Sequence, residues 1–212
     1  MPLLGSILDY LQPAITAFFT RNIPFSYRWR LLVFQPLAIL ISLLNDIPYA
    51  LSHHPKTTIY IPVRNGRKTR ALLYFPPSHL TQDHGQRQHL KQDQPRLRPL
   101  HLDIHGGAFM GGNPESGYRF CTYLSDNLDT TVVSTSYRLA PRHSFPAAID
   151  DIDDVVDWLL ENAKDAFNAD MTRFTIGGSS AGGNLALATC LRKHVRERVK
   201  RVLTFYAPVR LY

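Results

Sequence analysis

The chain has 212 residues, of which 44% are hydrophobic and 19% are charged, as expected for a globular protein with one sizeable core. The formal net charge is +7, but the basic residues are scattered rather than interleaved with aromatic residues on one face, which argues against a nucleic-acid-binding protein. The densest basic run, residues 192–201, is compatible with weak attraction to an anionic membrane surface.

Residues 1–52 are apolar and interrupted by prolines. The chain has no basic start and carries Asp9 early, which argues against a secretory signal and predicts a cytoplasmic protein, for which membrane association stays an open alternative. The most apolar run, Leu31–Leu44, has 14 residues including Gln35 and Pro36, whereas a membrane-spanning helix needs about 20. Three interpretations remain: a helical cap over a pocket, a segment that binds the membrane interface, or a true span.

We interpret residues 53–212 as one α/β core. Two strands are expected at Thr57–Val63 and Arg70–Phe75, on either side of the hairpin turn signal Asn65-Gly66. Residues 78–98 are rich in Gln, His and charged residues, which predicts a mobile polar insertion.

Strand and helix patterns alternate through the rest of the chain. Strands are expected at 100–104, 131–137, 173–176 and 202–207, and helices at 115–128, at 147–162 and after residue 182. This alternation predicts a mostly parallel central sheet with helices on both faces. The helix at 147–162 has an apolar face, and its aspartates are expected to form a solvated face: Asp150, Asp151, Asp153, Asp154 and Asp157.

The pattern G-x-S-x-G occurs at Gly178–Gly182, between a β-rich segment and a run of helix formers. A strand, a sharp turn and a helix in this order are the setting of a nucleophile elbow. Small neighbours let the strand and helix approach closely, so that the Oγ atom of Ser180 stands above the sheet edge near a helix N-terminus. We predict Ser180 as a catalytic nucleophile; the alternative is an ordinary Gly/Ser-rich turn.

A second motif, His105-Gly106-Gly107-Ala108-Phe109, follows the strand expected at 100–104 and is close to an HGGG-type oxyanion loop. Acyl transfer requires N–H donors aimed at the oxygen of the tetrahedral intermediate. The sequence therefore predicts an oxyanion hole formed by the N–H groups of Gly106, Gly107 and Ala181.

Four motifs stand in one order along the chain: HGGAF, YRLAP at 137–141, FPAA at 145–148 and GSSAGGNLA at 178–186. In this order and spacing they resemble the hormone-sensitive-lipase branch of the α/β-hydrolases, over residues 57–208. The resemblance implies a serine ester hydrolase with the chain order Ser…Asp…His, and it implies that His105 shapes the oxyanion loop rather than acting as a base. Ala108 stands where the family often has a third glycine, and Ser179 stands where it often has an acid.

The partners that Ser180 needs are not evident in the sequence. A serine hydroxyl requires a base within hydrogen-bond reach and an acid that orients this base. After Ser180 there is no aspartate, and the only glutamate and histidine are Glu197 and His194. On one continuous helix, His194 would lie about 21 Å from Ser180. We therefore expect neither the triad acid nor the triad histidine in this chain, which resembles a hydrolase truncated before its last strands.

Metal or cofactor chemistry has no support in the sequence. Cys121 and Cys190 are too few for a disulfide framework, and the 9 histidines form no HExxH or comparable ligand pattern. We therefore expect no metal and no cofactor. Three functions remain open: hydrolysis of short-acyl or aryl carboxylic esters through an acyl-enzyme, hydrolysis of amides or formamides by the same groups, and a non-catalytic or inactive family member that only binds a small ligand. A peripheral membrane or lipid-surface association is compatible with each of them.

Overall fold

The computed structural model describes residues 56–77 and 96–209 continuously, with scattered positions before them. The segment predicted at 1–52 as a cap or membrane-binding element therefore lies almost wholly outside the described residues, and so does most of the insertion predicted at 78–98. Within the described part of the chain, no helix has both the length and the apolar character needed to cross a bilayer.

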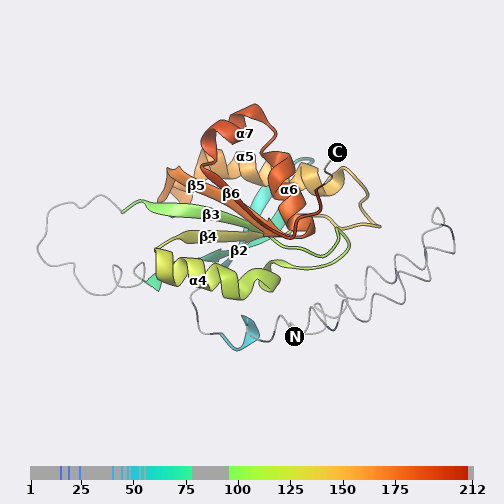
Figure 1. Ribbon diagram of the computed structural model, residues 1–212, viewed down its shortest axis with the longest axis horizontal. Helices are drawn as coiled ribbons and strands as arrows, with labels where there is room; N and C mark the ends of the chain where they lie inside the picture. Colours follow the sequence, from blue (N-terminus) through green and yellow to red (C-terminus); the bar gives the residue numbers. More distant parts are fainter. Residues whose placement is uncertain are drawn as a thin grey trace, which may run out of the picture.

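Six strands form one sheet in the order β1-β2-β4-β3-β5-β6 (Figure 1). Their bounds are Lys56–Val63 for β1, Arg67–Tyr74 for β2, Arg98–Ile104 for β3, Thr131–Thr135 for β4, Ala169–Ser179 for β5 and Arg201–Phe205 for β6. β1, β2 and β4 pair antiparallel, whereas β4, β3, β5 and β6 are parallel to one another. The prediction of a mostly parallel sheet is confirmed.

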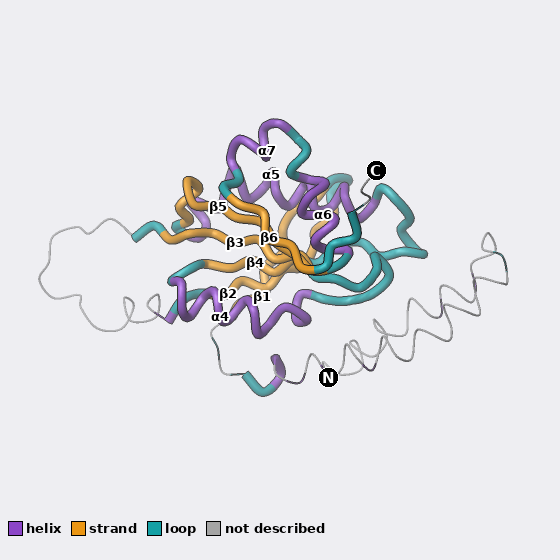
Figure 2. Tube along the Cα trace, viewed as in Figure 1, coloured by secondary structure: helices purple, strands orange, loops and turns teal. Residues whose placement is uncertain are grey.

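Helices cover both faces of this sheet, as predicted. α4 (Tyr118–Leu128) lies on one face, and α5 (Ala147–Phe167), α6 (Ala181–Thr189) and α7 (Lys193–Arg198) lie on the other (Figure 2). A short 3-10 turn, η1 (Pro114–Gly117), leads into α4. The larger core cluster contains the apolar face of α5, and a smaller cluster joins Cys121 of α4 to Leu72, Tyr74 and Val132 of the sheet.

The local turn signals in the sequence are confirmed. Asn65 and Gly66 both have left-handed φ values, 63° and 66°, in the hairpin between β1 and β2. This conformation matches the right-handed twist of the flanking strands, and Asn-Gly favours it. The parallel strand β5 begins earlier than predicted and includes an irregular stretch, described below.

The helix after Ser180 is shorter than predicted. The helix after Ser180 ends at Thr189, and a separate helix, α7, begins at Lys193, so His194 does not continue the elbow helix. Arg192 between them is extended, and its guanidinium group binds two aspartates of α5, Asp153 at 3.2 Å and Asp157 at 2.7 Å. These long-range ion pairs accompany the break, which local helix propensity does not indicate.

The aspartates of α5 are also not a uniformly solvated face. Asp151 is only 1% exposed, and its carboxylate accepts hydrogen bonds from the Arg138 backbone N–H at 3.0 Å and from the Arg138 side chain at 2.9 Å. Arg67 adds an ion pair at 3.1 Å. A buried carboxylate persists only when such partners compensate for its lost hydration, so this residue joins the YRLAP motif to α5.

β6 is an edge strand of the described part of the sheet. Val202, Leu203 and Phe205 are 37%, 43% and 43% exposed, although the strand is apolar. No described strand pairs with its outer edge. β6 therefore presents exposed apolar side chains next to the Ser180 turn.

Candidate active site

Ser180 occupies the turn between β5 and α6. Its backbone angles are φ 51° and ψ −121°, a combination that non-glycine residues rarely adopt. The N–H group of Ser180 donates to the carbonyl oxygen of Phe205 at 2.9 Å, which ties the turn to β6. Backbone strain of this kind is concentrated at functional sites and persists only where the surroundings enforce it. The geometry is that of an elbow rather than of a residue within a helix.

Two glycines make this turn possible. A Cβ atom on Gly182 would lie 2.0 Å from the carbonyl oxygen of Ile104, at the end of β3. A Cβ atom on Gly178 would lie 2.6 Å from the same oxygen and 2.6 Å from the carbonyl carbon of Gly182. Side chains at either position would collide with backbone, so β3, β5 and α6 can approach this closely only with glycine at both.

The loop after β3 lies directly against Ser180. A Cβ atom on Gly106 would be 2.9 Å from the carbonyl oxygen of Ser179 and 3.4 Å from the Cβ atom of Ser180. The N–H groups of Gly106, Gly107 and Ala181 have no acceptor within the described residues. The structure thus places Gly106 against the predicted nucleophile, with Gly107 next to Gly106 and Ala181 next to Ser180 in the chain.

The conformation of this loop explains why the family often has glycine at the position of Ala108. Gly107, Ala108 and Phe109 have φ values of 121°, 53° and 61°, so three successive residues are in the left-handed region. Ala108 occupies the position where the family often has glycine, and an L-residue pays roughly 1–2 kcal/mol for this conformation. The Gly107 carbonyl accepts hydrogen bonds from Met110 and Gly111 at 2.9 and 3.0 Å, which closes the turn.

His105 holds the start of the loop. Its ring stacks on Tyr137 with centroids 4.4 Å apart, and the Tyr137 hydroxyl donates to the His105 carbonyl at 3.1 Å. Nδ1 lies 2.7 Å from the Gly106 carbonyl oxygen, which can only accept, so Nδ1 carries the proton. Burial lowers the pKa of His105 to about 4, and the ring is therefore neutral near pH 7. These contacts fit the supporting role that the resemblance implies.

Further anchors of the loop are not visible in the sequence. Arg70 of β2 binds both carboxylate oxygens of Glu115 at 2.7 and 2.8 Å, which fixes η1 beyond the glycine loop. The side chain of Asn113 caps η1 by accepting from the Ser116 N–H at 3.0 Å. Arg70 and Glu115 are far apart in the chain, so only the folded register of β2 reveals the pair.

No described histidine or carboxylate contacts the hydroxyl of Ser180, which is half-buried. His194 instead pairs with Asp157 of α5 at 3.0 Å. His101 is buried on β3, where its Nδ1 atom lies 2.8 Å from the Thr175 hydroxyl. The described residues therefore present a nucleophile and N–H donors without a base at Ser180. In the same ranges, no three potential ligand side chains converge as a metal site.

Buried titratable groups on β3 predict a decrease of stability in acid. Burial lowers the pKa of His101 and His105 from 6.5 to about 4, so the stability that these neutral rings provide is present above pH 6.5 and is lost as the pH falls toward 4. Burial raises the pKa of Asp103 from 3.8 to about 6, and its protonation opposes part of this loss.

Between pH 6 and 4 the two histidines are protonated only in the unfolded chain, whereas Asp103 is protonated only in the folded protein. The unfolded chain therefore binds one proton more than the folded protein. We expect the free energy of unfolding to fall by about 1.4 kcal/mol per pH unit there. Asp103→Asn should roughly double this slope, because the opposing group is removed. Urea denaturation at closely spaced pH values measures both slopes; a pH-independent midpoint between pH 6.5 and 4 would contradict the prediction.

Comparisons with known proteins agree with this geometry. Residues 101–211 match the model of a family described as having the α/β-hydrolase fold. Ethyl acetate hydrolase of Pseudomonas putida is 33% identical over 154 residues, which are 72% of this chain and 42% of the bacterial protein. Arylacetamide deacetylase of Oryctolagus cuniculus is 42% identical over 101 residues, which are 46% of this chain and 25% of the rabbit protein.

A solved structure supports the same relationship. EstE1, a thermostable carboxylesterase cloned from a metagenomic library, superposes with a TM-score of 0.67 and 30% identity, covering 84% of this chain and 56% of that one. The chain spans less than half the length of the curated relatives that it matches. Because the matching family model covers more than half of the chain and includes both the Gly106 loop and the Ser180 turn, the chain belongs to the α/β-hydrolase fold family, in the hormone-sensitive-lipase-like branch that its four motifs indicate.

Proposed function

We propose that this chain carries the nucleophile and the oxyanion hole of a serine hydrolase that cleaves carboxylic esters of small molecules. The observation that carries the proposal is the strained turn of Ser180, with φ 51°, packed against the glycine loop. Among the relatives, one is named for hydrolysis of ethyl acetate and another as a carboxylesterase, which supports an ester with a short acyl group.

The reaction follows from the positions of these groups. The Oγ atom of Ser180 attacks the acyl carbon, and the N–H groups of Gly106, Gly107 and Ala181 stabilise the resulting oxyanion. The alcohol leaves, an acyl-enzyme remains, and water releases the acid. The proton of the serine must pass to a histidine base oriented by an acid, and neither partner is among the described residues near Ser180.

Amide hydrolysis is a second candidate, since the rabbit relative is named as an arylacetamide deacetylase. Both reactions use the same nucleophile and the same oxyanion donors. Initial rates of the native protein with p-nitrophenyl acetate, p-nitrophenyl butyrate and p-nitroacetanilide separate the two. We expect the acetyl ester to be cleaved fastest; a larger kcat/KM for the anilide would assign the amide reaction instead.

Labelling with a fluorophosphonate tests whether Ser180 is activated at all. In a form of the protein that also contains the histidine base and its acid, we expect rapid labelling, and peptide mass spectrometry should locate the label at Ser180. Absence of labelling in a folded sample would favour the alternative of a non-catalytic, ligand-binding or inactive member of the family. Cytoplasmic location and association with a lipid surface remain predictions of the sequence.

A further inference from the structure

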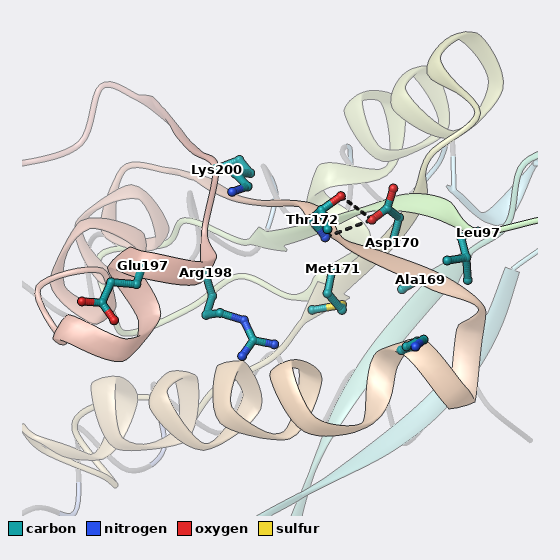
Figure 3. Close-up of a pocket in the computed structure, with 9 residues that line it drawn as sticks. Leu97, Ala169, Asp170, Met171, Thr172, Glu197, Arg198 and Lys200 are labelled. Atoms are coloured by element: carbon teal, nitrogen blue, oxygen red, sulfur yellow. Dashed lines mark hydrogen bonds between the residues drawn. The ribbon is translucent and has the colours of Figure 1, made fainter.

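A concave site is lined by the first residues of β5, at the opposite end of the strand from Ser180. Figure 3 shows the residues that line it. The pocket has a volume of about 400 Å³, within the range of about 300–1,000 Å³ that is typical of small-molecule sites. Its lining begins at the first residues of β5, and the strand rises about 26 Å between Thr172 and Ser180. The pocket is therefore separate from the candidate active site.

The wall of this pocket is an irregular stretch of β5. Asp170 pairs with Pro99 of β3, but the next paired residue is Phe174, so Met171–Arg173 leave the ladder. The carboxylate of Asp170 holds this stretch, since it accepts from the Thr172 N–H at 3.0 Å and from the Arg173 Nε at 2.6 Å. Irregularities of this kind re-aim side chains, and here Met171 is directed into the pocket beside α5 (Figure 3).

The floor of the pocket is apolar. Ala169 is buried, Met171 packs partly against the main core, and Leu97 is 42% exposed at the margin. The guanidinium group of Arg173 donates to the Leu97 carbonyl oxygen at 3.2 Å, which connects the irregular stretch to the margin of the pocket. These side chains offer a surface for an apolar chain, and methionine adapts its shape to such a ligand.

Three cations surround this floor. Lys164 belongs to the last turn of α5, Arg198 ends α7, and Lys200 precedes β6. All three are exposed, and none forms an ion pair with a described residue. In Figure 3, Arg198 extends toward α5, over the side of the pocket that holds Met171.

The two acids that line the pocket already have cationic partners. Asp170 binds Arg173 at 2.6 Å, and Glu197 lies 3.9 Å from Lys193. Glu197 also points away from Met171 in Figure 3. The three cations are thus uncompensated, and their summed field at the mouth of a concave, apolar site favours an anion.

We propose that this pocket binds an amphipathic anion, with its charged head at Arg198, in the field of Lys164 and Lys200, and its apolar chain on Met171 and Leu97. The head is a carboxylate or phosphate group, which forms charge-assisted hydrogen bonds with the guanidinium group of Arg198. The exposed position of the cations keeps their hydration cost small, and the chain removes apolar floor from water.

The methyl resonances of the methionines can report ligand binding in the pocket separately from binding near Ser180. The chain has 3 methionines, and Met110 lies in the loop that packs near Ser180, whereas Met171 lies in the pocket. In protein labelled with ¹³C at the methionine methyl groups, sodium octanoate should shift the Met171 resonance saturably and leave Met110 unchanged. Met171→Leu assigns the signal. A Met171 resonance that does not respond to octanoate would overturn the proposal.

Two further ligands separate the contributions of head and chain. Acetate has the head without the chain, and octyltrimethylammonium has the chain with the opposite charge. We expect octanoate to bind at least tenfold more tightly than either. Equal affinity for acetate, or for the cationic ligand, would contradict an amphipathic anion site. The titrations can be run in Ser180→Ala, so their result is independent of the proposed hydrolase function.

Charge reversal tests two of the three cations. The double variant Arg198→Glu/Lys200→Glu should bind octanoate at least tenfold more weakly than the parent protein. Arg196→Glu is a matched control, because it lies on the same helix α7 but does not line the pocket. Thermal melting must show that the variants are folded. An equal loss of affinity in the control would indicate general attraction between charges and would refute a defined site.

The same head and chain occur in free fatty-acid anions and in anionic membrane lipids. Flotation with phosphatidylcholine vesicles, with and without phosphatidylglycerol, distinguishes these sources. Flotation that requires phosphatidylglycerol and is abolished by octanoate would support the pocket with a membrane lipid as its ligand. Octanoate binding without flotation would support the pocket with a free anion.

Discussion

Ser180→Ala is expected to reduce kcat for p-nitrophenyl acetate by about 10⁶-fold in a form of the protein that also contains the histidine base and its acid, the scale seen when a serine nucleophile is removed from a hydrolase. The substitution removes the attacking Oγ atom and leaves the N–H donors of the loop in place. KM should change little, because the donors and the pocket still contact the substrate. Steady-state kinetics together with fluorophosphonate labelling measure the loss.

Ser179→Ala is the matched control for this experiment. Ser179 is the adjacent hydroxyl on the same strand end, and its side chain also lies near Gly106, where a Cβ atom would be 3.2 Å from its Oγ atom. It has an ordinary backbone conformation, unlike Ser180. Turnover and labelling should persist in this variant. Full turnover in folded Ser180→Ala, or loss of labelling only in Ser179→Ala, would refute the assignment of the nucleophile.

Gly182→Ala is expected to have the largest effect on stability. The added methyl group would lie 2.0 Å from the Ile104 carbonyl oxygen and 2.5 Å from that of His105. Both atoms belong to the backbone at the end of β3. This strand is paired on both sides, so it could move away only by breaking hydrogen bonds of the sheet. We expect a loss of more than about 4 kcal/mol in the free energy of unfolding, measured by urea denaturation.

Gly111→Ala provides the comparison at a neighbouring glycine. The nearest atom to its added methyl group would be the Gly107 carbonyl oxygen at 4.0 Å, and Gly111 does not have a left-handed φ. This variant should remain within about 0.5 kcal/mol of the parent, as surface substitutions usually do. If Gly182→Ala were equally harmless, the close contact between α6 and the end of β3 would not be present in solution.

The architecture was predictable because its signals are local. Asn65-Gly66 specifies a hairpin from the backbone preferences of two residues, and the alternation of strand and helix patterns specifies a parallel sheet. The elbow at Gly178–Gly182 is likewise encoded by small residues around one serine. Each of these patterns is contained in a short stretch, so that the sequence carries the information without knowledge of distant partners.

The parts that were missed depend on partners far along the chain. Nothing near Asp151 distinguishes it from the other aspartates of α5, and only the folded structure places Arg138 and Arg67 around it. The break between α6 and α7 depends in the same way on the ion pairs of Arg192 with α5. Periodicity reports one face of a helix, whereas these features require the identity of the facing side chains.

In the candidate active site, the residues within local motifs were predictable and the long-range contacts were not. Ser180 and Gly106 were identified from motifs, and the structure brings them into contact. The ion pair of Arg70 with Glu115, which fixes the loop from the opposite side, had no signal in the sequence. The roles assigned to the catalytic groups remain predictions until the labelling and kinetic experiments are done.

The hydrogen bond from the Ser180 N–H to the Phe205 carbonyl has a consequence for biosynthesis. A nascent polypeptide on the ribosome lacks this hydrogen bond until residue 205 has left the exit tunnel and β6 has joined the sheet. Shorter translation intermediates would therefore contain the serine without this restraint on its backbone.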